Sequence, residues 1–547
     1  MKSDEFKIFN LKNRKFGEIK IVRTLIVDAL RSEKGIKRFT RDFIGAGPRT
    51  IAGILESYGI NSKIITPENL NIKELTDYDL LFISAMTIDL IAVNKVIKKW
   101  KRYNNSPIFI GGPITSNPFD LKSLEFNLAF MGESEESLEK IINFGLKDGK
   151  LPSFSDLKKI NGIFYRKNGE IIIIKPNSYI SKEMLNKFQP SIERITDYPY
   201  YFIARVYIEC IRGCSNFLRP TIKLSENIEC NNCGKCSDSL DERLDCPQNI
   251  PPGCGFCSVP SVYGPPRSRS VSNIVNEIKG LIRKGVRRLV LGGSDFLDYE
   301  REELVKPLPL TDPYHPLPNS EKIEELLSEI TSIPEVKNNK AYIFIENIKA
   351  CLFSREIAKI ISKYLPNTSV SIGCESGSSD YLKSIGKPSS VEDIIKSIRI
   401  CKEFGIRTHC YFIHGLPNQN ISVLKETKDL MENLDKIGTD KITIYRFKPL
   451  PKSSFEKFNY KRYKLSEQIK KLAIKINYNR KLALIDKKFQ VVIAEPHKRN
   501  KNDGIGYILE GGPTVLIKNG GKLIGKEVIV RIISVLSDKF VEGEIIN

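Results

Sequence analysis

The feature that most constrains this chain is a group of cysteines near its middle. Of the 12 cysteines in 547 residues, eight fall between Glu209 and Ser258. Three of them follow a Cys-x2-Cys-x2-Cys pattern and a fourth precedes a proline, which is ferredoxin spacing. A further pair, Cys254 and Cys257, lies in a glycine-bearing loop, and Cys214 follows an apolar run that predicts a strand. The fold must therefore hold several thiols within reach of a shared ligand.

Four interpretations of these thiols compete. Disulfides are disfavoured, because the first 209 residues contain no cysteine and no secretory signal is present. Core packing explains one isolated cysteine, but it does not explain eight in polar loops. Zinc stays open, because paired Cys-x2-Cys motifs suit tetrahedral thiolate sites. We favour iron–sulfur ligation, because it accounts for the ferredoxin spacing.

Two short motifs then resemble a known family. Arg-Gly-Cys214 followed by Cys254-Gly-Phe-Cys257 resembles the signature RGCxxxCxFC of the radical S-adenosylmethionine (SAM) enzymes. The resemblance implies that Cys214, Cys254 and Cys257 bind a [4Fe–4S] cluster whose open iron binds SAM. The departure is that 39 residues, 215–253, separate the first two cysteines. This insertion would carry an auxiliary cluster on Cys230, Cys233, Cys236 and Cys246, with Cys210 left over as a core or spare thiol.

Later motifs extend the resemblance. Gly292-Gly293-Ser294 ends a predicted strand and resembles the glycine-rich stretch that meets the amino and carboxylate groups of SAM. Gly-x-Glu375-Ser376-Gly-Ser resembles a signature of cobalamin-type and methylthio-type members, in which Glu375 and Ser376 would face SAM. The resemblance implies a partial parallel β/α barrel over residues 201–455, with its active site at the strand C-termini. The remaining cysteines are expected to be core thiols, and they are Cys351, Cys374, Cys401 and Cys410.

Residues 21–145 alternate strand and helix patterns, which predicts a doubly wound, Rossmann-like parallel sheet. Ligands of such sheets bind at strand C-termini. The layout resembles the cobalamin-binding domain that precedes many radical SAM domains, although no histidine occurs before His315. The N-terminal domain of methylthiotransferases and a domain that binds nothing remain alternatives. The residues expected at the cobalamin site are Ser84, Gly111, Gly112, Gly132 and Glu133.

The rest of the chain divides by pattern. Residues 1–20 predict a basic arm, 146–200 a connector with a hairpin, and 456–488 a basic helical linker. Residues 489–547 predict short strands with glycine turns, and they resemble the small β-barrel TRAM domain that grips RNA. Such barrels bind nucleic acid through basic faces and loops. The expected fold is therefore α/β, with a doubly wound sheet, a partial barrel and a small C-terminal β-barrel.

The chain carries a formal net charge of +21, which suggests a polyanionic partner. Residues 441–547 hold 23 Lys and Arg against 10 Asp and Glu, so the C-terminal fifth supplies well over half of the excess. A lysine-rich proteome and a barrel that only caps the core are the alternatives. No apolar run reaches the roughly 20 residues that span a bilayer, and no targeting segment is recognised, so a cytoplasmic location is expected.

The resemblance implies an enzyme that cleaves SAM to a 5′-deoxyadenosyl radical, with an electron donor such as ferredoxin or flavodoxin. We expect cobalamin-dependent methylation, or methylthiolation, of an RNA base in tRNA or rRNA. Modification of a protein or lipid is the alternative, and a non-enzymatic iron–sulfur RNA-binding protein is a third. The sequence assigns no catalytic side chain.

Overall fold

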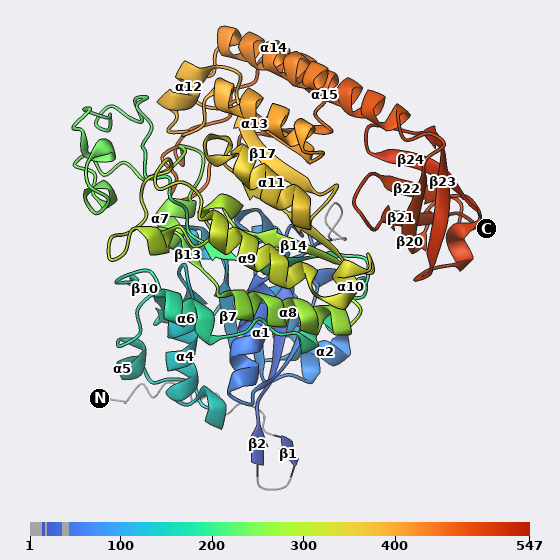
Figure 1. Ribbon diagram of the computed structural model, residues 1–547. Coiled ribbons are helices and arrows are strands. Elements are labelled where there is room, and N and C mark those ends of the chain that lie inside the picture. The colour runs from blue at the N-terminus through green and yellow to red at the C-terminus, as the bar shows by residue number, and fades with distance from the viewer. Residues whose placement is uncertain (1–13, 17–18, 36–42, 547) are drawn as a thin grey trace, which may run out of the picture. The chain divides into compact units, whose positions relative to one another are not determined.

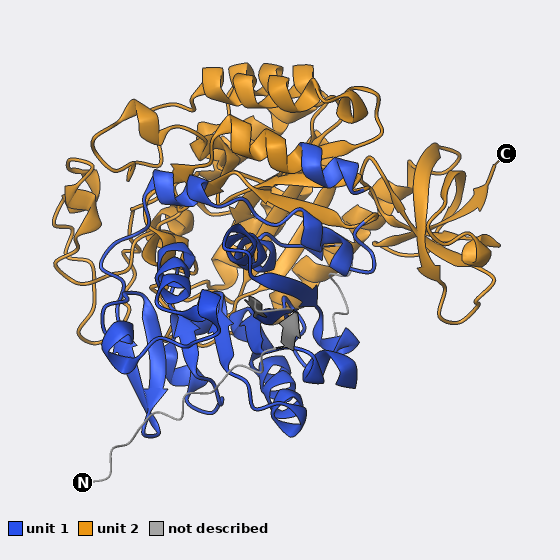
Figure 2. Cartoon of the chain, turned by 90° about the horizontal axis from the view of Figure 1, so that it is seen from below, with its two compact units in different colours: residues 1–201, 279–284 blue, residues 202–278, 285–547 orange. Residues whose placement is uncertain are grey.

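The computed structural model describes residues 14–16, 19–35 and 43–546 (Figure 1). The chain forms two compact units, residues 1–201 with 279–284, and residues 202–278 with 285–547 (Figure 2). Most of the basic arm predicted at residues 1–20 lies outside the described residues. Its described parts are two short antiparallel strands, β1 (Arg14–Phe16) and β2 (Ile19–Ile21).

The first unit is built on a parallel sheet whose five strands run in the order β5-β3-β6-β7-β8. In chain order this is 2-1-3-4-5, the flavodoxin-like doubly wound arrangement, with its switch point between β3 and β6. The predicted doubly wound sheet is confirmed. The strands are β3 (Arg23–Asp28), β5 (Asn61–Ile65), β6 (Leu80–Ser84), β7 (Ile108–Gly111) and β8 (Leu128–Phe130). The helices are α1 (Gly47–Ser57), α2 (Ile72–Thr76), α3 (Leu90–Tyr103) and α4 (Glu135–Asn143).

The hairpin predicted within the connector is part of this sheet. Strand β9 (Ile163–Lys167) pairs antiparallel with β8, and β10 (Glu170–Ile174) pairs with β9. Phe164 and Tyr165 of β9 are buried, so the hairpin contributes apolar surface to the core. Short helices α5 (Phe154–Leu157) and α6 (Lys182–Lys187) flank it.

The second unit contains the partial barrel. Strands β11, β14 and β15 pair in parallel, as do β16, β17, β18 and β19. The backbone N–H of Ser371 donates to the carbonyl of Glu346 (2.7 Å), which joins the two sets where β15 gives way to β16. The predicted partial β/α barrel is confirmed. Its strands are β11 (Arg205–Glu209), β14 (Arg288–Gly292), β15 (Tyr342–Ile345), β16 (Asn347–Ile348), β17 (Ser369–Glu375), β18 (Arg407–His414) and β19 (Lys441–Arg446).

Amphipathic helices connect these strands, and side chains cap several of them. Ser390 and Asp393 form a capping box at one helix start, and Ser354 accepts the N–H of Ile357 at another. Ser354 and Ser390 thereby satisfy backbone donors that the first helical turn leaves unpaired. The connecting helices are α8 (Val271–Arg283), α9 (Ser320–Thr331), α11 (Arg355–Tyr364), α13 (Val391–Glu403) and α14 (Ile421–Ile437).

A small closed barrel ends the chain, as predicted. Its strand order is β20-β21-β22-β24-β23, with β22 and β24 parallel, which is the Greek-key arrangement of OB-folds. Val491, Ile493, Val515 and Ile517 lie in its core. The strands are β20 (Lys488–Pro496), β21 (Gly504–Ile508), β22 (Thr514–Ile517), β23 (Glu527–Val535) and β24 (Phe540–Ile545).

The small barrel packs on the N-terminal ends of the large barrel's strands. Arg407, the first residue of β18, donates to the carbonyls of Gly511 (3.1 Å) and Glu510 (2.7 Å). The hydroxyl of Tyr342, the first residue of β15, donates to the side-chain oxygen of Gln490 (3.4 Å). The small barrel therefore closes the end opposite the strand C-termini. In the described part of the chain, no helix combines the length and apolarity needed to cross a membrane.

The predicted basic linker forms a helix, α15 (Lys464–Leu482), which lies against β19 and beside α14 (Figure 1). Asn477 of α15 is buried, and its amide oxygen accepts the N–H of Ile442 (2.9 Å) while its amide nitrogen donates to the Ile442 carbonyl (2.7 Å). One side chain thus satisfies both backbone groups of Ile442 in β19. The predicted linker is therefore a structural part of the large barrel.

We predict that Asn477→Ala destabilises the second unit, because it leaves two buried backbone groups without partners. The expected loss is about 2–4 kcal/mol of unfolding free energy. Urea denaturation followed by circular dichroism measures it. Asn479→Ala, at an exposed position on the same helix, is the matched control. Equal denaturation midpoints for the two variants would show that the Asn477 bonds contribute nothing.

Candidate active site

Two loops bring Cys214, Cys254 and Cys257 together at the C-terminal end of the large barrel. Asn216 links them: its backbone N–H points to the Cys214 sulfur (3.5 Å) and its side-chain amide to the Cys254 sulfur (3.4 Å). The same amide also donates to the Gly386 carbonyl at 2.9 Å. The backbone N–H of Cys257 donates a hydrogen bond to the Cys254 carbonyl (2.8 Å). A thirty-nine-residue insertion therefore does not prevent the three predicted ligands from meeting.

Burial dominates the chemistry of these thiols. It raises the pKa of Cys254 to about 11 and that of Cys257 to about 12, and the neighbouring sulfurs add to the rise. The thiols of the metal-free chain therefore keep their protons at neutral pH, and a metal that binds them must displace those protons.

A buried charged network lies beneath Cys214. The Lys349 ammonium contacts Asp295 (2.9 Å), Asp298 (2.7 Å) and the Ser215 hydroxyl (3.0 Å). Arg301 forms a second ion pair with Asp298. Burial alone would raise the pKa of Asp298, but the two cations outweigh it and lower that pKa to about 2. The network fixes the residue next to Cys214, and the sequence patterns did not reveal it, because its members come from three separate loops.

The predicted SAM-contacting residues mostly border the same strand ends. The Glu375 carboxylate pairs with Lys387 (3.2 Å), and a Cβ added to Gly373 would meet both side chains, at 2.5 and 2.8 Å. Lys387 was missed by sequence reasoning, although its charge acts on Cys254. Gly292 ends β14 close to Tyr207, and Gly293 follows it close to Ile211. The Ser294 hydroxyl donates to the Gly213 carbonyl.

Ser376 was predicted to face SAM together with Glu375, and that assignment stays a prediction. Ser376 is fully buried, and its hydroxyl lies 3.3 Å from that of Thr427 in α14. Glu375, with φ at +61°, points instead toward Lys387. The Glu375 and Ser376 side chains therefore have different surroundings in this structure.

Comparison with known proteins is consistent with this geometry. Residues 245–431 match the radical SAM superfamily. These residues form a radical SAM domain. An uncharacterised protein of Methanocaldococcus jannaschii is 42% identical over 96% of this chain and 99% of its own length. The radical SAM methyltransferase TsrM from Kitasatospora setae, solved with cobalamin and a [4Fe-4S] cluster, shares the fold over 80% of this chain and 74% of that chain, with a TM-score of 0.56 at 13% identity.

A further relative is the ribosomal protein uS12 methylthiotransferase RimO of Clostridium novyi. It is 30% identical over 34% of this chain and 39% of its own length. The matched superfamily segment begins after Cys214, so the first cluster ligand is supported by the contacts of Asn216 and by the Arg-Gly-Cys motif. The chain is a radical SAM enzyme, and SAM and a [4Fe–4S] cluster are its cofactors.

The second cysteine set lies in the insertion. Cys233 is exposed, and Cys230, Cys236 and Cys246 are partly buried. Arg219 organises this segment: it is buried, reaches the Cys236 sulfur at 3.5 Å, and donates to the carbonyls of Ile250 and Arg243, both at 2.9 Å. The auxiliary cluster on these four residues remains a prediction.

The other cysteines behave mostly as expected. Cys210, Cys374, Cys401 and Cys410 are fully buried, in agreement with a core role. Cys351 is only partly buried, and its backbone N–H donates to Ser389 at 3.2 Å.

In the first unit, the residues predicted for cobalamin lie at the C-terminal edge of the sheet. Ser84 and Gly111 end β6 and β7, and Gly112 adopts φ +90° where a Cβ would strike the Ala85 carbonyl at 2.7 Å. Glycine is therefore required there by the close approach of two strand exits. The Glu133 carboxylate accepts the N–H of Ile180 (3.0 Å), which is a structural contact. Gly132 also has positive φ, +73°.

This edge fits a ligand that is held by backbone groups and shape. No histidine precedes His315 in the sequence, so this unit offers no imidazole ligand to a corrinoid cobalt. The glycines at positions 111, 112 and 132 keep side chains away from the strand exits. The residues fit cobalamin provided that its cobalt needs no histidine from this unit.

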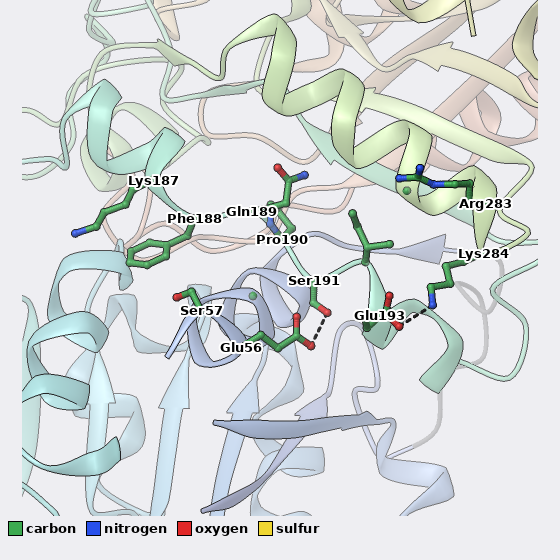
Figure 3. A pocket seen from close by; sticks show the side chains of 13 residues that line it. Glu56, Ser57, Lys187, Phe188, Gln189, Pro190, Ser191, Glu193, Arg283 and Lys284 are labelled. Carbon is green, nitrogen blue, oxygen red and sulfur yellow. Dashed lines mark hydrogen bonds and ion pairs between the residues drawn. The ribbon is translucent and has the colours of Figure 1, made fainter. Parts of the chain in front are cut away.

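A pocket of about 810 Å³ lies elsewhere in the first unit, along α1 (Figure 3). Its walls include the C-terminal residues of α1 and residues 187–193. Figure 3 shows Glu56 turned toward Ser191, at 2.8 Å, and Glu193 toward Lys284, at 2.6 Å. The pocket contains none of the predicted site residues, and its lining charges Lys187, Glu56 and Glu193 pair with Glu139, Arg194 and Lys284 respectively.

We predict two separable clusters. Replacing Cys230, Cys233 and Cys236 together by alanine should leave about four of about eight irons and preserve SAM cleavage, because these residues lie outside the SAM-binding set. Iron analysis and 5′-deoxyadenosine formation measure the two effects. Cys254→Ala is the counterpart that should abolish cleavage. Loss of both clusters in the triple variant would show that our partition of the cysteines is wrong.

Proposed function

We propose that this radical SAM enzyme transfers a methyl group to a base of RNA and uses cobalamin as the methyl carrier. The observation that carries the proposal is the presence, in one chain, of a three-cysteine cluster loop and a 2-1-3-4-5 doubly wound unit. Doubly wound sheets bind ligands at the switch point, where Ser84 lies in this chain. The likeness to cobalamin-bound TsrM over most of the chain supports the same assignment of fold.

The chain's own residues would hold and orient SAM. When bound, the reduced cluster supplies the electron that cleaves a C–S bond of SAM. Cys214, Cys254 and Cys257 provide the thiolates. The opposite charges of Glu375 and Lys387 suit the ammonium and carboxylate of the methionine moiety. Because Gly373 has no side chain, the space beside it is available to the Glu375–Lys387 pair.

The interior of the barrel is polar, which favours a substrate rich in hydrogen-bonding groups. The Tyr207 hydroxyl donates to Glu346 (2.8 Å), and the hydroxyls of Ser371 and Tyr411 lie 3.4 Å apart. Burial is the main cause of the strongly raised pKa of Tyr207, so this phenol stays protonated as a donor. Tyr411 also stacks on Tyr445 with ring centroids 5.7 Å apart. Polar groups and aromatic rings of this kind suit a nucleobase better than a lipid chain.

Methylthio transfer is the second candidate. The likeness to a methylthiotransferase over part of the chain favours it, and so does the second cysteine set, which could hold the additional cluster. In that case the first unit would bind no corrinoid.

The function is tested by anaerobic reconstitution with SAM, a reductant, cobalamin and total archaeal RNA. Mass spectrometry of RNA digests should show the mass gain of one methyl group on one base, and Cys254→Ala should abolish it, because that variant loses the SAM cluster. Cys351→Ala, which alters a thiol outside both ligand sets, is the control. A methylthio mass gain would select the second candidate, and modification of added protein or lipid instead of RNA would refute the RNA substrate.

We also predict that protein from cobalamin-supplied cells carries a corrinoid absorption spectrum, because Ser84 and Gly112 lie at the C-terminal edge of a doubly wound sheet, where such sheets bind ligands. His315→Ala should leave this spectrum unchanged, since His315 lies outside the first unit. A protein that is colourless once its clusters are removed would contradict cobalamin binding.

A further inference from the structure

The excess positive charge lies before the small barrel, not on it. Residues 441–488 hold 15 Lys and Arg against 3 Asp and Glu, whereas residues 489–547 hold 8 against 7. The net charge of the small barrel is therefore only +1, and that of the preceding segment is +12. A surface that attracts a polyanion must be sought in the preceding segment.

Within it, residues 446–464 form what we call the basic strap. This segment runs from the end of β19 to the start of α15 and contains seven cations against one acid, Glu456. All seven cations are exposed. They are Arg446, Lys448, Lys452, Lys457, Lys461, Arg462 and Lys464.

The strap contacts the loop that carries two cluster ligands. The Phe455 N–H donates to the Gly255 carbonyl (2.8 Å), and the Ser454 hydroxyl donates to the Pro251 carbonyl (2.9 Å). A Cβ on Gly255 would strike the Phe455 ring at 2.3 Å, so glycine between Cys254 and Cys257 makes room for the strap. The strap is therefore fixed beside the cluster.

The strap is also fastened to the ends of the barrel strands. The Phe447 N–H donates to the His414 carbonyl (2.9 Å), and the Tyr460 ring packs edge-on against the His414 ring with centroids 5.5 Å apart. The Arg446 guanidinium lies over the Tyr460 ring, 4.0 Å from its centroid. The path of the strap is set by these buried anchors, which leaves its lysines in solvent.

These lysines have no competing partners. In the described part of the chain, Lys448, Lys452, Lys457, Lys461 and Lys464 make no ion pair within 4.0 Å, and Arg462 has only a loose one, 3.7 Å from Glu467. Glu456 accepts the backbone N–H of Lys452 (2.7 Å). The positive charge of the strap is thus available to an external anion.

Aromatic and apolar exposure indicates which anion. Tyr445, at the edge of the strap, is 47% exposed and stacks on Tyr411 inside the barrel. Phe447 and Phe455 are buried, so the strap presents neither of them for insertion into a bilayer. Cations interleaved with an accessible aromatic face are the arrangement that binds single-stranded nucleic acid.

We propose that the basic strap, residues 446–464, is the surface that binds the phosphate backbone of the RNA substrate and positions a base at the cluster end of the barrel. This inference rests on the proposed RNA substrate and relocates the contact from the C-terminal barrel to the active-site side. Phosphate contacts position a nucleic acid without reading its sequence, so the strap sets where the RNA lies and other groups select the base.

The test compares two full-length variants that each lose three exposed lysines. K448Q/K457Q/K461Q alters the strap, and K498Q/K501Q/K522Q alters the small barrel. The strap variant should bind tRNA more than about tenfold more weakly. Its log–log salt slope should be less negative by about 2, since each phosphate contact on single strands contributes roughly 0.7. Iron content and SAM cleavage without RNA should be unchanged. The small-barrel variant should stay within about twofold of the unaltered chain in tRNA affinity.

The outcomes distinguish a failure of the strap proposal from a failure of the proposed RNA-modifying function. If the unaltered chain modifies RNA and the strap variant keeps its affinity, the strap proposal fails while the RNA function stands. Loss of binding in the small-barrel variant alone would place the RNA surface on the barrel. If the unaltered chain neither binds nor modifies RNA, the proposed function itself fails. Strap-dependent binding to phosphatidylglycerol vesicles without RNA binding would also overturn the proposal.

Discussion

The active site depends on closing an insertion of 39 residues so that its two ends meet. Three contacts fasten the stem of this loop. The Gly253 N–H donates to the Leu218 carbonyl (2.7 Å), the Asn216 amide reaches Cys254, and Arg219 donates to the Ile250 carbonyl. Closing a long loop costs entropy that rises only slowly with its length, so a few bonds at the stem suffice. Once the stem is closed, Cys214 and Cys254 sit beside each other as they do in a short motif.

A second constraint keeps this stem in register with the barrel. Lys349, Asp295, Asp298 and Arg301 form a buried network directly behind Cys214. Taking charges out of water is costly, and an apolar core of the same volume would often be more stable. The network instead imposes definite directions on its members, because each oxygen and each ammonium hydrogen needs a partner. The Ser215 N–H and hydroxyl both donate to the Asp298 carboxylate, at 3.1 and 2.9 Å. Asp298 therefore fixes the position of the loop that carries Cys214.

Local patterns predicted the secondary structure well, because apolar runs and glycine exits are visible in sequence. Gly292, expected at the end of a strand, is the last residue of β14. The three SAM-cluster cysteines followed from their Arg-Gly-Cys and Cys-x2-Cys contexts. Lys349 and Lys387 could not be found in this way, since a lysine acquires a buried role only through partners distant in sequence. The contact between the Ser376 and Thr427 hydroxyls could not be predicted from the motif, because Thr427 lies 51 residues later in the chain and β17 pairs irregularly between Gly373 and Glu375. Counting the charge of residues 441–547 as one segment hid the difference between residues 441–488, which carry most of the excess, and the nearly neutral small barrel.

The two ends of the large barrel have different roles. At the N-terminal end, the Arg407 guanidinium donates hydrogen bonds to two backbone carbonyls of the small barrel. Nearby His409 has its pKa lowered to about 3, first by burial and then by Lys441 and Arg407, so it stays neutral and takes no part in charge balance at neutral pH. That end is therefore sealed by packing. The C-terminal end carries the thiols, the Glu375–Lys387 pair and the cations of the strap. A large anionic substrate can reach the polar interior only from the side where its charge is attracted, so the chemistry and the electrostatics converge on one end of the barrel.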